Sequence, residues 1–264
     1  MNIVLFINGT LGLRVLDFVS DLQDYKLSGV VLNSDVKRAP SYLEEVEGLI
    51  RAKRLVLPIL LWNRKDSPTE ELESILSEGN FGVSALFGHI LPDGVIGKFS
   101  GGILNLHPSL LPIGRGADPV PWGIIERQKH GITLHLMDKG LDTGDIIYQK
   151  EISSDSTMNA GEIYEIAMSE LFKVFSSLFV RWTNGQIQAK PQSKTSNSQH
   201  KSSDLDLMRV IKDSEIGTFG EFIRRIQATS FSNGNLPKYT DSEGKIWDIA
   251  IKILKPEKNE QEWK

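Results

Sequence analysis

Apolar residues in the first part of the chain follow two patterns that predict alternating strands and helices. Residues 2–7 (NIVLFI) form an apolar run without alternation that ends at Asn8-Gly9, as expected for a parallel strand buried on both faces. Residues 12–22 show helical spacing of apolar positions, and residues 27–32 form a second apolar run. This order predicts a strand-helix-strand unit with a right-handed crossover.

The same patterns continue to residue 189 and predict the rest of one α/β fold. Further strands are expected at 82–87, 103–106, 131–137 and 145–152, and further helices at 70–77 and 160–182. We therefore expect a Rossmann-like, mostly parallel sheet with flanking helices.

The composition changes after residue 189, which predicts a domain boundary. Residues 190–204 (KPQSKTSNSQHKSSD) are polar and rich in serine, which indicates an exposed linker. Beyond it we expect a helix at 219–228 and a β-hairpin with its turn at 241–244 and its second strand at 246–254. The predicted organisation is a catalytic domain (1–189), a linker (190–204) and a small C-terminal subdomain (205–264) that ends in a frayed, charged tail (255–264).

Composition and charge narrow the classes of function. The 264 residues carry a net charge of −4 with a pI near 5.8, which argues against a large nucleic-acid footprint because such a surface needs a basic patch. The chain has no cysteine, which excludes disulfides, thiolate metal sites and cysteine nucleophiles. No apolar run reaches the ~18 residues of a membrane span, and the first residues lack the features of a signal peptide. We expect a cytoplasmic protein without membrane contact.

The turn after the first strand resembles a dinucleotide-binding turn only weakly. Asn8-Gly9-Thr10-Leu11-Gly12 lacks the G-x-G-x-x-G spacing, and no acidic residue stands in the expected place after the second strand. A tight turn is the better interpretation, against which a polar substrate could still lie.

Polar residues gather where a buried core would not place them. Asn105 and His107 are two residues apart at the end of a predicted strand, so both side chains project on the same side. Ligands of open α/β sheets bind at this end of the strands. Arg115 lies in a Gly-flanked loop, and Asp142 lies in a turn rich in acids and glycines between two further strands.

These residue types suit the transfer of an acyl group to an amine without a metal or a covalent intermediate on the enzyme. Asn105 and His107 can donate hydrogen bonds to the oxyanion of a tetrahedral intermediate. Asp142, near His107, would favour an imidazolium and accept the proton of the attacking nitrogen, directly or through water.

Other interpretations of the same residues stay open. Taken singly, an Asn-x-His at a strand end and an Asp-Thr-Gly segment also fit ordinary turns. His135, in the middle of a strand, fits a buried structural residue as well as a site residue. His89 fits a loop residue, and His130 and His200 are expected to be exposed and without a role. Ser109 lacks the G-x-S-x-G context of a hydrolase nucleophile, and the His and Asp residues match no metal-site spacing.

Three segments together resemble the folate-dependent formyltransferases. They are GHILPDGVI, GGILNLHPSLLPIGRGADP and HGITLHLMDKGLDTGDII, and the likeness covers residues 81–152. The resemblance implies 10-formyltetrahydrofolate as formyl donor and Asn105, His107 and Asp142 as the catalytic set. The implied folate-binding residues are Phe87, Gly88, His89, Ile90, Leu91, Asp138 and Leu141.

The branches of that family differ in the amine that accepts the formyl group, so the resemblance to the whole family does not identify the acceptor. Two features resemble enzymes that formylate nucleotide-linked amino-deoxy sugars for surface glycans or lipopolysaccharide. They are the GRGADPVPWGI loop and the segment 221–231, which a hairpin follows. The implied substrate-binding residues are Asn8, Gly9, Thr10, Arg115, Gly116, Trp122 and Arg225. Enzymes of the sugar branch often have arginine immediately before the alanine that corresponds to Ala228, whereas this chain has Gln227 there.

Alternatives to this acceptor remain. One is a methionyl-tRNA formyltransferase with a reduced C-terminal domain, and another is a formyltetrahydrofolate hydrolase, in which water replaces the amine. A third is a folate-binding module without catalysis, which an intact Asn105, His107 and Asp142 argue against. Sugar enzymes of this kind are commonly dimers, so the resemblance also suggests a homodimer.

Overall fold

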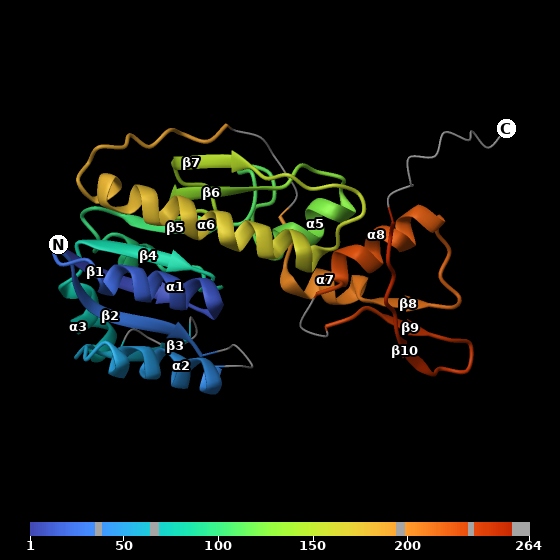
Figure 1. The fold of residues 1–264 in the computed structure, drawn as a ribbon, viewed down its shortest axis with the longest axis horizontal. Coiled ribbons are helices and arrows are strands. Elements are labelled where there is room, and N and C mark those ends of the chain that lie inside the picture. The colour runs from blue at the N-terminus through green and yellow to red at the C-terminus, as the bar shows by residue number, and fades with distance from the viewer. Residues whose placement is uncertain (35–38, 64–68, 194–198, 232–234, 255–264) are drawn as a thin grey trace.

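A seven-stranded sheet forms the centre of the computed structural model, which describes residues 1–34, 39–63, 69–193, 199–231 and 235–254. Its strands are β1 (Asn2–Ile7), β2 (Lys26–Asn33), β3 (Ile59–Trp62), β4 (Phe81–Ala85), β5 (Ile103–His107), β6 (Gly131–Leu136) and β7 (Ile146–Glu151). They lie in the order β3-β2-β1-β4-β5-β6-β7 (Figure 1). The first five strands pair in parallel, whereas β6 pairs antiparallel with both of its neighbours, β5 and β7. The mostly parallel α/β fold is therefore confirmed.

Helices cover both faces of this sheet, which explains the apolar runs without alternation. The helices α1 (Gly9–Ser20), α2 (Ala39–Ala52) and α6 (Ala160–Thr183) pack on one face, and α3 (Glu70–Ser77) and α4 (Asp93–Ile96) on the other (Figure 1). In β1, Ile3 and Leu5 join the core beneath the first set, whereas Val4 and Phe6 join the core beneath the second. Every position of such a strand faces a core, because neither face is solvated.

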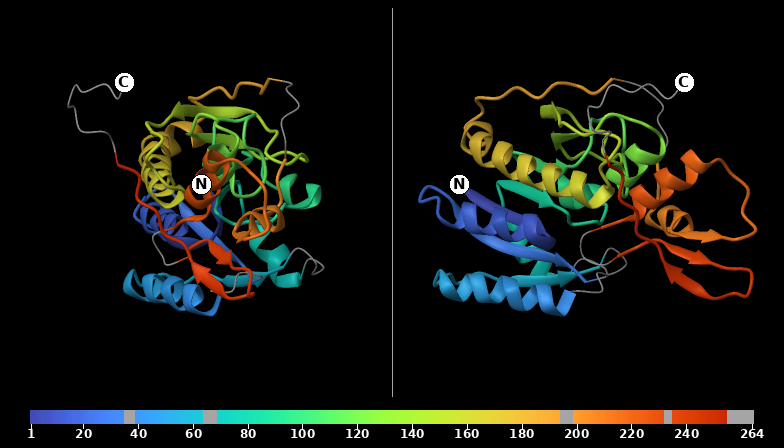
Figure 2. Two further views of the ribbon diagram at one scale, coloured as in Figure 1. Left: turned by 90° about the vertical axis from the view of Figure 1, so that its right-hand side faces the viewer. Right: turned by 45° about the vertical axis from the view of Figure 1, so that its right-hand side comes forward.

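The C-terminal part forms a small subdomain beyond one end of the main sheet (Figures 1 and 2). Its elements are α7 (Ser202–Met208), β8 (Val210–Lys212), α8 (Phe219–Thr229), β9 (Lys238–Thr240) and β10 (Ile246–Asp248), and its sheet has the order β10-β9-β8. The helix α8 packs on α5 (Pro119–Ile125) and α6. The predicted helix and hairpin are confirmed, with the Asp241 carboxylate accepting the N–H groups of Glu243 and Lys245 in the turn. The second strand is shorter than expected and ends at Asp248.

Two predicted boundaries in the main sheet move for identifiable reasons. The strand expected at 82–87 ends at Ala85, because Leu86 takes a left-handed conformation with φ 57°. The first helix begins at Gly9, directly after the extended Asn8, and not at residue 12. The start of α6 was placed correctly, where Asn159 and Glu162 form a capping box.

Most of the described residues in the expected linker, 190–193 and 199–204, are exposed, but backbone bonds attach the segment to the main domain. Lys190 exchanges two backbone hydrogen bonds with Ile146 at 2.7 and 2.8 Å, and the carbonyl of His200 accepts from Ala117 N–H at 3.1 Å. The helix α7 begins at Ser202. The polar composition predicts the exposure of this segment, whereas its backbone bonds to the main domain are not visible in the sequence.

Several elements carry no clear signal in the sequence and were not predicted: α2, β3, α4, α5, α7 and β8. The helix α5 is short and holds Pro119 and Pro121, which suggest a loop until tertiary contacts bury the segment. The tail at 255–264 lies outside the described residues. Within the residues described, no helix has both the length and the apolar character needed to cross a membrane.

Candidate active site

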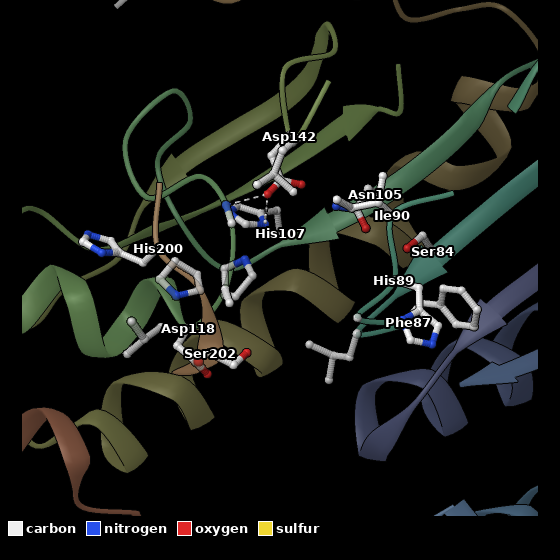
Figure 3. Close-up of a pocket in the computed structure, with 18 of the residues that line it drawn as sticks. Ser84, Phe87, His89, Ile90, Asn105, His107, Asp118, Asp142, His200 and Ser202 are labelled. Carbon is white, nitrogen blue, oxygen red and sulfur yellow. Dashed lines mark hydrogen bonds and ion pairs between the residues drawn. The ribbon is translucent and has the colours of Figure 1, made fainter. Parts of the chain in front are cut away.

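The strand β5 carries the first two site residues to the carboxyl end of the sheet. Asn105 lies opposite Ser84 of β4 on one side and His135 of β6 on the other. His107 follows at the end of β5, opposite Thr133. The alternation of a strand therefore turns both side chains toward the same space, as the sequence predicted (Figure 3).

The hydrogen bonds of His107 fix its tautomer. Its Nε2–H donates to the carbonyl of Gly114 at 2.8 Å, since a carbonyl can only accept. In the neutral ring Nδ1 is then unprotonated, and it lies 3.8 Å from Oδ2 of Asp142. Burial lowers the pKa of His107, and the nearby Asp142 carboxylate opposes this without cancelling it. Asp142 favours the imidazolium, as expected, but desolvation of the buried ring outweighs it and holds the pKa of His107 below its ordinary value.

His135 belongs to the same group, which resolves the ambiguity of its mid-strand position. Its ring is 1% exposed, and its Nδ1–H donates to the carbonyl of Leu136 at 3.0 Å. The bare Nε2 accepts from the Asn105 amide at 3.0 Å and lies 3.6 Å from Oδ1 of Asp142. This bond orients the Asn105 amide and occupies one of its two N–H groups, so the second is free to serve a ligand.

Asp142 sits between the two imidazoles, in the loop that joins β6 and β7. Its Oδ2 accepts the backbone N–H of Gly116 at 2.8 Å, and its backbone is left-handed with φ 52°. Burial alone would raise the pKa of this carboxyl, but His107, His135 and the Gly116 N–H outweigh burial and hold the pKa well below its ordinary value. Asp142 is therefore ionised at neutral pH.

These residues line a cavity of about 1100 Å³ with two walls. Figure 3 shows Phe87, His89 and Ile90 on one side of the Asn105–His107–Asp142 group and Asp118, His200 and Ser202 on the other. Gly88, Leu91 and Met137 adjoin the first wall, and the second is completed by Gly116, Lys201, Arg209, Tyr164, Phe231 and Asn235. Asp138, Gly140 and Leu141 also line the cavity, and the Leu141 side chain lies beside Gly116. All seven residues predicted to hold folate thus line the cavity.

The first wall is held from behind by two buried amides. Asn8 and Asn33, at the carboxyl ends of β1 and β2, both donate side-chain N–H groups to the carbonyl of Phe87, at 3.1 and 2.8 Å. The ring of Trp62 stacks on that of Phe87, with an interplanar angle of 2° and centroids 6.1 Å apart. Gly88 follows with φ 77°, a conformation that favours glycine. The turn after β1 therefore shapes this wall, whereas the sequence placed it against a substrate.

Of the seven residues predicted to bind the acceptor, only Gly116 lines the cavity. Arg115 donates from its guanidinium to Oε1 of Gln192 at 2.6 Å, and Trp122 is buried, its indole stacked on the ring of His200 at 3.7 Å. The remaining four are also placed elsewhere. Asn8 lies behind Phe87, Gly9 and Thr10 are exposed at the start of α1, and Arg225 bonds to Glu215 and to the carbonyls of Met208 and Val210.

The second wall holds polar residues that the sequence did not single out. Asp118 is mostly buried, and burial raises the pKa of its carboxyl, while Arg209 and a hydrogen bond from Ser202 oppose that rise. His200 is largely buried and its Nε2 lies 2.7 Å from a carboxylate oxygen of Glu126, so the expectation of an exposed histidine without partners is wrong. The expectation for His130 is wrong as well, because its ring is 8% exposed. No local pattern marks Asp118 or Arg209, which the fold brings together from positions 91 residues apart.

Within the described residues, no three His, Asp or Glu side chains are arranged to hold a metal ion. The arrangement offers one amide donor, one neutral imidazole with a bare nitrogen and one carboxylate at the junction of two walls. Such a set can bind an oxyanion and accept a proton from a nucleophile.

Known proteins show the same fold over most of the chain. A 4-N formyltransferase from Francisella tularensis aligns over 97% of this chain and 98% of its own, with a TM-score of 0.78 and 20% identity. Relatives found by sequence match only a part of the chain. Methionyl-tRNA formyltransferase of Clostridium perfringens is 43% identical over 112 residues, which are 42% of this chain and 35% of that enzyme.

A second relative acts on a different acceptor. The dTDP-4-amino-4,6-dideoxyglucose formyltransferase of Mycobacterium tuberculosis is 31% identical over 155 residues, which are 59% of this chain and 65% of that enzyme. Both matches thus span less than two thirds of the relative. Residues 1–175 as a whole match the formyl transferase family. This chain belongs to the formyl transferase family.

Proposed function

We propose that this protein transfers a formyl group from 10-formyltetrahydrofolate to the amine of a nucleotide-linked amino-deoxy sugar. Two relatives support the chemistry by their names, since one formylates methionyl-tRNA and the other a dTDP-linked amino sugar. A formyltransferase from Anoxybacillus kamchatkensis, 28% identical with a TM-score of 0.52, was crystallised with tetrahydrofolate and a UDP-linked formamido sugar. It covers 68% of this chain and 88% of its own.

The observation that carries the proposal is the meeting of Asn105, His107 and Asp142 between two walls of one cavity. Drug-sized ligands occupy pockets of ~300–1,000 Å³. The cavity of about 1100 Å³ lies just above that range, and it extends to both sides of the reacting groups, where a donor and an acceptor would bind. A transfer between two bound molecules needs such an arrangement, because the reacting atoms must meet in a fixed geometry.

The first wall fits the folate donor. Leu86, Phe87, Ile90, Leu91 and Met137 supply apolar surface for a flat ring. The segment that bears Gly88 offers backbone groups beside them, positioned by the amides of Asn8 and Asn33. The donor would supply the activated formyl carbon.

Asn105, His107 and Asp142 supply the hydrogen-bond donor and the proton acceptors that the transfer requires. The free N–H of Asn105 donates to the oxyanion that develops on the formyl oxygen. Nδ1 of His107 and Oδ2 of Asp142 are two acceptors 3.8 Å apart, so a nitrogen placed between them can donate to both. The proton lost by the attacking amine moves to this pair and is returned to the donor nitrogen, which leaves as its bond to the formyl carbon breaks. The carboxylate stabilises the imidazolium if the ring carries the proton in between.

The second wall fits the anionic part of the acceptor. Lys201 and Arg209 place two cations on it, although the whole chain is negatively charged. Guanidinium groups suit phosphate oxygens because they donate two parallel hydrogen bonds. The rings of Tyr164 and Phe231, with centroids 6.3 Å apart, add an aromatic patch that a nucleotide base could contact.

A methionyl-tRNA acceptor is the second candidate, and the 43% identity to a clostridial enzyme of that kind favours it. The acidic balance of this chain favours the sugar, because a large nucleic-acid surface requires many cations. Hydrolysis of the donor, in which water replaces the amine, is the third candidate.

A panel assay separates these candidates. The protein is incubated with 10-formyltetrahydrofolate and one acceptor at a time, drawn from dTDP- and UDP-linked amino sugars and charged initiator tRNA. Release of tetrahydrofolate is recorded together with formylation of the acceptor. The proposal requires coupled release and formylation with an amino sugar. Release without any acceptor would favour the hydrolase, and formylation of the tRNA alone would replace the proposed substrate.

A further inference from the structure

Gln192 joins the two loops that meet at Asp142. Its Nε2 donates to the carbonyls of Asp142 at 2.9 Å and of Gly144 at 2.7 Å. Its Oε1 accepts from the guanidinium of Arg115 at 2.6 Å. One side chain therefore ties the Asp142 loop to the neighbouring residue of Gly116, whose N–H binds the Asp142 carboxylate.

The Asp142 loop needs such a support because its backbone is strained. Asp142 has φ 52°, and a left-handed residue other than glycine costs ~1–3 kcal/mol unless its surroundings impose it. The carboxylate must also keep its distances of 3.8 Å to His107 and 3.6 Å to His135. Both requirements concern the same residue, and the Gln192 amide is bonded to its backbone.

We propose that Gln192 is a positioning residue, whose amide holds the Asp142 carboxylate between His107 and His135. The inference rests on the proposed function for the role of Asp142 in catalysis, but the positioning itself is independent of it. Gln192 does not act on a ligand. Both hydrogens of its amide nitrogen are used within the protein, and its side chain is not among those that line the cavity.

Three substitutions separate the parts of this role. Gln192→Glu keeps the shape and an acceptor for Arg115 but loses both donations to the loop and sets its oxygens against the carbonyls of Asp142 and Gly144. Gln192→Ala loses all three bonds. Gln192→Asn keeps the amide on a shorter side chain, so it should recover part of the wild-type rate.

Turnover should fall while substrate binding is retained. A displacement of about 1 Å in a catalytic group can cost about 100-fold in rate. We expect kcat to fall by about that factor in Gln192→Ala and Gln192→Glu, with KM for donor and acceptor within about twofold of wild type.

A second readout needs no substrate. The groups whose charge acts on His107 are Asp142, which raises its pKa, and His135, which lowers it. Those acting on Asp142 are the two imidazoles, with the Gly116 N–H as hydrogen-bond donor. If Gln192 positions the carboxylate, its removal should lower the pKa of His107 further. NMR titration of the imidazole signals, assigned with His107→Gln, measures this directly.

Gln227 of α8 provides the matched control. Its buried amide also donates to two backbone carbonyls, of Ser156 at 2.8 Å and Met158 at 3.2 Å, and it does not line the cavity. Gln227→Ala should lower the thermal midpoint about as much as Gln192→Ala while leaving kcat and the His107 titration unchanged.

The outcomes are distinguishable. A lowered pKa of His107 in Gln192→Ala, with no shift in Gln227→Ala, supports the positioning role. It does so even if the wild type formylates no amino sugar, a result that would contradict the proposed function alone. An unshifted His107 titration in folded Gln192→Ala, or wild-type kcat in both Gln192→Ala and Gln192→Glu, overturns the inference. An equal loss of kcat in Gln227→Ala overturns it as well, because the effect would then be general destabilisation.

Discussion

Replacing Asp142 by asparagine tests the electrostatic core of the site without changing its shape. The new side chain can still accept the N–H of Gly116, which Asp142 binds at 2.8 Å, so the loop should keep its conformation. What the variant loses is a full negative charge 3.8 Å from Nδ1 of His107. The predicted defect is therefore in the proton transfer and not in the fold.

The size of the defect follows from that distance. Two unit charges 3.8 Å apart interact by about 4 kcal/mol at an effective dielectric constant of about 20. If the imidazole of His107 gains a proton as the amine attacks, this stabilisation disappears in Asp142→Asn. At 1.36 kcal/mol per tenfold change in rate, kcat should fall by about a thousandfold. That value lies within the usual range of about 10²–10⁴ for general acid–base catalysis.

The assay is single-turnover formyl transfer at saturating donor and acceptor, with the folded state of the variant checked by its thermal midpoint. Saturation matters because the reasoning predicts a loss in kcat with KM little changed. A fall of less than about tenfold would refute it, since the charge would then contribute almost nothing to the transition state. A large rise in KM with unchanged kcat would also refute it, because Asp142 would then bind substrate and not assist proton transfer.

Three further predictions concern separate parts of the site. Asn105→Leu removes the amide aimed at the oxyanion and should lower kcat by about 10²–10³, measured in the same assay, whereas wild-type turnover would exclude that role. Arg209→Ala should raise KM for a nucleotide-linked sugar at least about tenfold and leave KM for the folate donor unchanged. An effect on KM for the donor would contradict the binding of the sugar nucleotide's phosphate at Arg209. Burial lowers the pKa of His107 and of His130. Below about pH 6.5 the unfolded chain therefore binds more protons than the folded one. The free energy of unfolding should then fall as the pH drops through that region, by at most ~1.4 kcal/mol per pH unit for each ring. Urea unfolding at several pH values should show this slope reduced in His130→Gln, and an unchanged slope would contradict the burial effect.

The sequence predicted the parts of the molecule whose signals are local. Unalternating runs such as residues 2–7 identify strands buried on both faces, and the alternation within β5 places Asn105 and His107 on one side. The helical pattern of residues 160–182 likewise identifies α6, which spans Ala160–Thr183. Chemistry that depends on one strand or one turn could therefore be read directly from the chain.

What the sequence did not predict arises from contacts between distant segments. His135 joins the site because β6 pairs antiparallel with β5 in a register that sets it opposite Asn105. Arg115 lies near the site in sequence, yet its guanidinium is bonded to Gln192, 77 residues later. The polar composition around Gln192 predicted an exposed linker, whereas its amide is bonded to the loop of Asp142. Such pairings depend on register and tertiary packing, which a local pattern does not contain.

In the proposed reaction, a formyl group passes between two molecules bound on either side of Asn105, His107 and Asp142. The most direct measurement uses donor labelled with ¹³C in the formyl group and follows the label by NMR in the presence of a nucleotide-linked amino sugar. The account predicts a new formamide signal on the sugar with wild-type protein, and only a trace at the same time point with Asp142→Asn. Label that appears as free formate, or an undiminished formamide signal with the variant, would contradict it.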